Sequence, residues 1–201
     1  MSAKEEKFWE MLREQGNLWK EIAEDFYQAM DGNASVEICK EIGSMRRRHP
    51  FRESNLAEKL YRAYKDPYRQ GEAQRLLSQC EEMLSDGYEI LRLLCVIDIR
   101  ECSKITIEMV RLVAEGLLEW QKLLDYTIDM KTNELRIEAR VRKILTFEER
   151  SEEFMLQGLQ VIYRSENKCV GIYHKEIFYR LENILSMTAQ NAKLLSHLLE
   201  I

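Results

Sequence analysis

The stretch SKITIEMVRLVAEGLLEWQKLLDYTIDM, residues 103–130, decides the fold class of this chain. Its apolar residues recur at intervals of three and four, which is the spacing of one face of an α-helix. Ser103 is a suitable N-cap, because its hydroxyl can accept a hydrogen bond from the first helical turn. The residues on the apolar face are Ile105, Met109, Leu112, Val113, Leu117, Trp120 and Leu124. The stretch therefore predicts one long amphipathic helix.

The same periodicity extends in both directions from this helix. The further predicted helices run over residues 5–30, 34–65 with a kink near Pro50, 69–99, 132–164 beginning with a cap at Thr132 or Asn133, and from about 172 to the end after a link at 165–171. A helix of about 28 residues is about 40 Å long, and short links between such rods place them antiparallel. No alternating strand pattern competes with this interpretation. The sequence predicts an all-α, elongated six-helix bundle in one domain, residues 1–201.

The two halves of the chain show an internal repeat. Cys80-Glu81-Glu82-Met83-Leu84-Ser85 aligns with Leu181-Glu182-Asn183-Ile184-Leu185-Ser186 at an offset of 101 residues. Both copies place an acidic or amide pair before an apolar pair and end in serine, which chance alignment of two amphipathic helices does not require. We therefore expect two three-helix pseudo-repeats, residues 1–100 and 101–201.

Composition and charge limit the setting of the protein. Hydrophobic residues make up 45% of the chain and charged residues 32%, a globular mixture. The net charge of −5 argues against nucleic acid as a partner. The charged N-terminus is unlike a signal peptide, and no apolar run reaches the length of a membrane-spanning helix. The five cysteines lack metal-ligand spacing and are expected to be reduced thiols, so a cytoplasmic location is predicted.

Short motifs near the predicted turns resemble those of the PhoU-like phosphate-transport regulators, in particular the compact branch associated with Pit-type phosphate permeases. The motifs are Phe8-Trp9-Glu10-Met11-Leu12, Pro67-Tyr68-Arg69-Gln70-Gly71-Glu72-Ala73 followed by Leu76-Leu77, Glu81-Glu82, Phe147-Glu148 through Glu152, and Lys175-Glu176-Ile177 through Leu181-Glu182-Asn183. The resemblance covers nearly the whole chain. It implies a PhoU-like bundle and a role in regulating phosphate transport.

The resemblance also implies a carboxylate metal site on the bundle surface, for a divalent metal or iron. The candidate ligands are Glu148, Glu152, Glu182, Glu81 and Glu82. Residues four apart share a helix face, and oxygen-rich clusters suit hard cations. Acids expected in the family are replaced by Asn183, Ser85 and Ser186, so the site is expected to be degenerate. The alternative interpretation of the Glu148–Glu153 acids is a solvated helix face.

One basic run, Arg46-Arg47-Arg48-His49, stands where the first repeat would carry the counterpart of Glu148 and Glu152. It has three interpretations. The run is plain surface charge before the kink at Pro50; or Arg46, Arg47 and Arg48 form a salt-bridge cluster that replaces metal; or they bind an anion such as phosphate.

Three functions from different classes remain open. The first is a non-enzymatic regulator or accessory protein of phosphate transport, which binds a phosphate permease or a signalling protein at the cytoplasmic face of the membrane. The second is a metal-binding bundle with a storage or hydrolytic role. The third is a structural scaffold or homodimer without a ligand. No catalytic motif such as G-x-S-x-G occurs, and His49, His174 and His197 share no ligand spacing.

Overall fold

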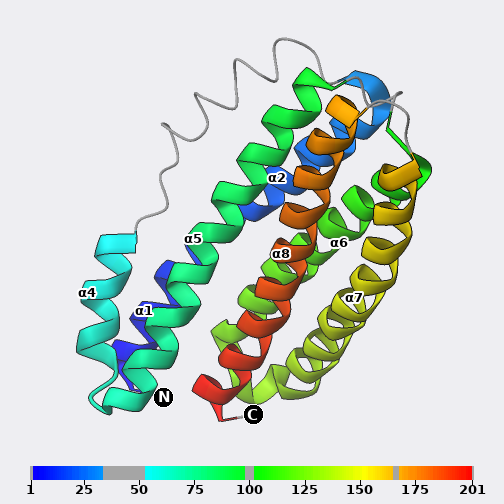
Figure 1. Cartoon of the computed structure of the whole chain (residues 1–201). Helices are drawn as coiled ribbons and strands as arrows, with labels where there is room; N and C mark the ends of the chain where they lie inside the picture. Colours follow the sequence, from blue (N-terminus) through cyan, green and yellow to red (C-terminus); the bar gives the residue numbers. More distant parts are fainter. Residues whose placement is uncertain (1, 34–52, 98–101, 165–167, 201) are drawn as a thin grey trace.

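The computed structural model describes residues 2–33, 53–97, 102–164 and 168–200 (Figure 1). All regular structure in these ranges is helical. The helices are α1 (Ala3–Glu14), α2 (Gly16–Gln28), a π-helical turn (Ala29–Asn33), α4 (Glu53–Ala63), α5 (Pro67–Val96), α6 (Lys104–Tyr126), a 3-10 turn (Thr127–Asp129), α7 (Met130–Arg164) and α8 (Lys168–Leu199). The predicted all-α class is confirmed.

The long helices form an elongated bundle, with both chain termini at one end (Figure 1). α8 packs along α5 and α7, and α6 packs against α2, α7 and α8. Together they enclose one continuous apolar core in which Trp9, Trp19 and Trp120 are fully buried. The three tryptophans anchor the core, and Trp120 was predicted to lie on an apolar face. No helix in the described ranges has the length and apolar character to cross a membrane.

Two helices begin at side-chain caps, of which the cap at Ser103 was predicted. The Ser103 hydroxyl accepts a hydrogen bond from the Thr106 amide at 3.2 Å and begins α6. Asp66 caps α5 by accepting from the Arg69 amide at 3.0 Å, and Pro67 occupies the first helical position. Proline is favoured there because that amide has no intrahelical partner.

Two predicted boundaries are wrong. The helix predicted over residues 5–30 is interrupted at Gln15 between α1 and α2, and α1 packs mainly on α4 while α2 packs on α6. The fifth helix starts before Thr132, at Met130, and the side chain of Asp129 accepts from the Thr132 amide at 3.4 Å. The packing of α1 on α4 and of α2 on α6 is not visible in a local pattern, whereas the Asp129 contact joins residues three apart. The predicted kink at residues 48–52 lies outside the described residues.

One cysteine contradicts the prediction that the cysteines are reduced. Cys80 and Cys102 form no disulfide, and Cys80 is completely buried. Cys95 is disulfide-bonded, so the expectation that every cysteine is reduced is wrong at this residue. A disulfide requires two sulfurs brought together by the tertiary structure, which sequence spacing does not report.

Two side-chain contacts join residues that are 101 apart in the sequence. The Asn183 amide donates to Glu82 at 3.2 Å, and the rings of Trp19 and Trp120 meet edge to face with centroids 6.3 Å apart. A residue that touches its own counterpart lies beside the axis relating the two halves. Both contacts therefore support the proposed division into two pseudo-repeats, with α2 meeting α6 and α5 meeting α8 across that axis.

Candidate functional site

Three of the predicted metal-ligand carboxylates converge where α7 meets α8. Glu148 and Glu152 lie one turn apart on α7, and Glu182 is half-buried on α8. Burial raises the pKa of the Glu182 carboxyl, and the negative charges of Glu148 and Glu152 raise that pKa further. The three groups are therefore close enough to repel one another.

Besides the negatively charged Glu182, two side chains of α8 contact Glu148. The Ser186 hydroxyl donates to it at 3.4 Å, and the Lys193 ammonium lies 3.6 Å from its other oxygen. Ser186 stands where the family resemblance implied an acid. The serine and the lysine thus supply donors that offset part of the repulsion.

Glu81 and Glu82 are both exposed on α5. Glu82 accepts the hydrogen bond from Asn183. The structure thereby divides the predicted set, with Glu148, Glu152 and Glu182 at the α7–α8 contact and Glu82 at the α5–α8 contact.

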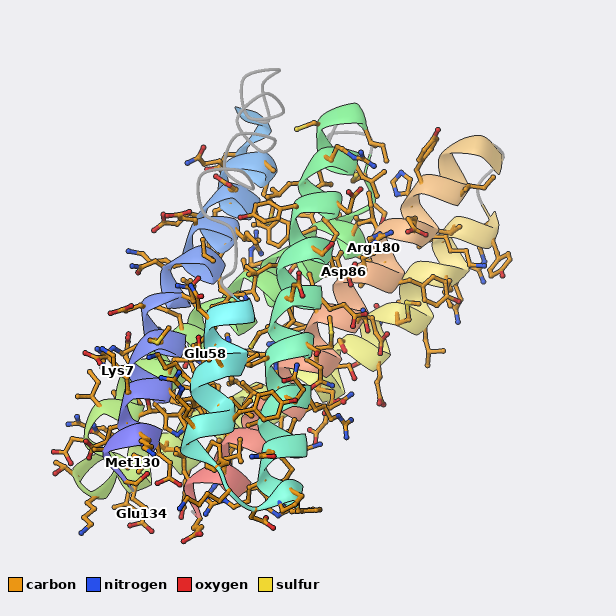
Figure 2. All side chains as sticks on the ribbon, turned by 90° about the vertical axis from the view of Figure 1, so that its left-hand side faces the viewer. Lys7, Glu58, Asp86, Met130, Glu134 and Arg180 are labelled. Atoms are coloured by element: carbon orange, nitrogen blue, oxygen red, sulfur yellow. The ribbon has the colours of Figure 1, made fainter. Side chains whose placement is uncertain are left out.

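The buried carboxylate at the α5–α8 contact is Asp86, which the sequence reasoning missed. Its residue surface is only 6% exposed. Arg180 of α8 donates to one carboxylate oxygen at 2.5 Å, and the Asn183 amide donates to the other at 2.8 Å. Figure 2 shows Asp86 and Arg180 facing each other across the two helices. Asp86 lies one turn after Glu82, a spacing that could have marked it as a member of the same face.

Arg180 bridges acids of both helices. It binds Asp86 of α5 and, one turn away on α8, Glu176 at 2.7 Å. Asn183 likewise donates to both Glu82 and Asp86. We call Glu82, Asp86, Arg180 and Asn183 the α5–α8 polar cluster. The Arg180 guanidinium and the Asn183 amide satisfy the carboxylates of this cluster with hydrogen bonds. The guanidinium also supplies the positive charge that a metal ion would bring.

The fit of these residues to a metal is incomplete. Among the residues that the structure describes, no group of three or more His, Cys, Asp or Glu side chains is arranged to hold an ion. Arg180, Asn183, Ser186 and Lys193 already satisfy acceptors of the nearby acids. Metal binding by Glu148, Glu152, Glu182, Glu81 and Glu82 stays a prediction.

Arg46, Arg47 and Arg48 lie outside the described residues, so none of their three interpretations is tested. Within the described helices, one cation that neutralises a buried acid is Arg180, which pairs with Asp86. Its partner is 94 residues away in the sequence. No local pattern could have identified that pair.

Comparison with known proteins agrees with this architecture. No protein-family model matches the chain, and no curated protein sequence matches it. A solved structure, that of PhoU from Pseudomonas aeruginosa, superposes with a TM-score of 0.69 and 17% sequence identity over 98% of each chain. At this identity the likeness establishes the fold. The chain has the all-α helical-bundle fold of PhoU.

Proposed function

We propose that this protein is a regulator or accessory protein of phosphate transport that acts by protein–protein binding at the cytoplasmic face of the membrane. The observation that carries the proposal is the structural likeness to PhoU over 98% of both chains. Because the match covers the whole length, the two proteins share the entire bundle. The likeness is therefore more than the few helices that many all-α proteins have in common. The motif resemblance in the turns and acidic helices supports the same assignment independently.

The chemistry of the bundle suits binding better than catalysis. In the candidate site, Asp86 and Glu148 are each held by cationic or amide donors. Carboxylates neutralised in this way are poor general bases, because a base needs a free lone pair within reach of its substrate. The partner proposed is a phosphate permease or a signalling protein.

Deletion of the gene and measurement of phosphate uptake test this function. We expect altered uptake in the deletion strain and recovery on complementation with the wild-type chain. A pull-down with the tagged full chain should retain a phosphate permease or a signalling protein. Unchanged uptake together with the absence of such a partner would overturn the proposal.

A second proposal concerns metal at the α7–α8 contact, and it rests on the crowding of Glu148, Glu152 and Glu182. Burial and then the negative charges of Glu148 and Glu152 raise the pKa of Glu182, and a bound cation would relieve the repulsion among the three carboxylates. The carboxylate oxygens of these three residues are suitable ligands for iron or for a divalent metal such as manganese or zinc. Glu81 and Glu82, which are exposed on α5, are the further candidates.

Elemental analysis and thermal shifts test the metal proposal. Bound metal in the purified protein, or a rise in Tm with Mn²⁺, Zn²⁺ or Fe²⁺ that Glu182→Gln removes, is the expected result. Glu153→Gln is the matched control, because Glu153 is exposed on α7 next to Glu152. The proposal fails when no metal copurifies and no ion shifts the Tm, or when both variants respond alike.

A further inference from the structure

The contact between α6 and α7 holds a group of side chains with more positive than negative charge. Lys122 of α6 donates to the Glu119 carboxylate on the same helix, and Arg140 and Lys143 donate to it from α7, which lies alongside (Figure 1). One acid balances one of these three cations, so two positive charges remain uncompensated in a chain whose net charge is −5. We call Lys122, Arg140, Lys143 and Glu119 the α6–α7 basic cluster.

No acid stands one helical turn before or after Arg140 or Lys143 on α7. Besides these two cations themselves, the residues three and four positions away are Arg136, Ile137, Ala139, Ile144, Thr146 and Phe147. Glu138 precedes Arg140 by two residues and therefore lies on the opposite side of the helix, where it pairs with Arg142 at 2.7 Å. α7 thus adds no negative charge to the cluster.

Two further acids of α6, Asp125 and Glu115, each lie one turn from the cluster. Burial raises the pKa of Asp125, and the positive charge of Arg13 on α1 opposes that rise, so Asp125 has a counter-charge of its own. Glu115 is matched in number by Arg136, which lies one turn before the cluster on α7. The excess of two positive charges therefore stands when both acids and these two arginines are counted.

Burial separates the acid of the cluster from its cations. The Glu119 side chain is 5% exposed, whereas those of Lys122, Arg140 and Lys143 are 46%, 30% and 48% exposed. An ammonium has three N–H donors and a guanidinium has five, so contact with Glu119 leaves donors available. The cluster is therefore a buried carboxylate below cations that a ligand can reach.

The buried carboxylate also holds the cations close together. The ammonium nitrogens of Lys122 and Lys143 are each 3.1 Å from the same Glu119 oxygen, and the Arg140 guanidinium contacts the other oxygen. The two nitrogens are therefore at most about 6 Å apart, a distance at which like charges repel. A second anion on the exposed side would relieve that repulsion. It would also find the cations already positioned, which lowers the entropy cost of binding.

We propose that the α6–α7 basic cluster binds a doubly charged tetrahedral oxyanion of the phosphate class. Two negative charges match the excess of positive charge. A tetrahedral anion has oxygens in several directions and can accept from one arginine and two lysines at once, whereas a side-chain carboxylate has two oxygens in one plane and a single charge. This inference goes beyond the proposed function, because anion binding is measured on the purified chain without any transporter or partner.

Titration calorimetry and thermal unfolding of the full chain with phosphate test the proposal, at about pH 8 so that the anion is doubly charged. Chloride at equal ionic strength is the reference. We expect saturable binding of phosphate and a rise in Tm that chloride does not give. Lys143→Gln should weaken phosphate binding at least about tenfold, because a charged hydrogen bond is lost.

A parallel titration with glycerol phosphate separates two sources of the same group. Tighter binding of glycerol phosphate would assign the site to a phosphate ester, and tighter binding of phosphate would assign it to the free ion. Either order supports an oxyanion site at the cluster.

Arg142→Gln is the matched control. Arg142 stands next to Lys143 in the sequence, is 77% exposed and pairs with Glu138 on the other side of α7. It should bind phosphate as the wild type does. Circular dichroism checks the fold of each variant, and Lys122→Gln replaces Lys143→Gln if the latter is unfolded.

Absence of wild-type binding with phosphate up to about 10 mM, which fills most of a site with a Kd of about 1 mM, overturns the proposal. So do equal losses in the Lys143 and Arg142 variants, or a rise in Tm that chloride reproduces. None of these results bears on phosphate uptake in the deletion strain, so the two proposals fail separately.

Discussion

At the scale of single residues, Glu119 is the most heavily paired carboxylate of the described chain. It lies on α6 with its side chain 5% exposed, and it accepts from Lys122 and Lys143 at 3.1 Å each and from Arg140. Burial opposes its ionisation, but the hydrogen bonds from Lys122, Lys143 and Arg140 outweigh burial and lower the pKa of Glu119. The carboxylate ties α6 to α7.

Glu119→Gln should destabilise the protein by about 1–3 kcal/mol, because three cations lose their shared partner. The stability from a carboxyl with a lowered pKa is present above its ordinary value of 4.5 and is lost as the pH falls through the folded-state value. The difference between wild type and variant in urea unfolding should therefore be full at pH 7 and shrink in acid. A difference that stays constant with pH would contradict the role of this charge.

Glu182 is the opposite case. Because the pKa of Glu182 is raised, its protonated form suits the fold, and the stability it contributes in acid is lost as the pH rises through that pKa. Glu182→Gln should therefore raise the stability of the metal-free protein at pH 7 by up to about 0.5 kcal/mol after solvent screening. Thermal unfolding at pH 7 and pH 4 measures it, and the gain should vanish at the lower pH. A lower stability at pH 7 would contradict the repulsion.

At the scale of helices, the packing of α7 on α8 depends on a close approach at Gly158. A Cβ at this position would lie 2.4 Å from the Phe178 ring. Gly116 allows a similar approach of α6 to Leu185 of α8. Glycine in a helix is unfavourable by itself, so these positions are explained by contact between helices.

Gly158→Ala should cost about 1–3 kcal/mol, because the Phe178 ring must move out of its place in the core. Gly71→Ala is the matched control: Gly71 is helical, and an added Cβ there meets nothing within 4 Å. It should stabilise the protein by about 0.5–1 kcal/mol through helix propensity. Chemical unfolding of both variants gives the two signs. Equal effects would show that the contact with Phe178 is unimportant.

At the scale of the whole molecule, the two halves meet through Trp19 of α2 and Trp120 of α6. Both indole rings are fully buried, and their planes cross at 86°. A second contact between the halves is the hydrogen bond from Asn183 of α8 to Glu82 of α5. The proposed pseudo-repeats therefore share one core and are expected to unfold together.

A double-mutant cycle on Trp19→Phe and Trp120→Phe should give a coupling energy of about 0.5–1.5 kcal/mol in urea unfolding, the usual size for an edge-to-face aromatic pair. Tyr64→Phe combined with Trp120→Phe is the control. Tyr64 packs on Phe8 and accepts from the Trp9 indole at 3.1 Å, away from this pair. Its cycle should be additive. Additivity of the tryptophan pair would contradict direct contact between the halves.

The sequence by itself determined the helical class, the cap at Ser103 and the burial of Trp120. These features depend on residue spacing within a few turns, where side chain and backbone meet locally. It also marked Glu148, Glu152 and Glu182 as members of acidic helix faces. The identity of each face is local information, so a pattern can report it.

Only the tertiary structure decided which faces meet. The pairing of Asp86 with Arg180 and the raised pKa of Glu182 both arise from contacts between distant segments. A carboxylate next to an arginine and one next to two other carboxylates look alike in sequence. Their charges act over a few ångströms of space, and the packing of α5, α7 and α8 sets that distance.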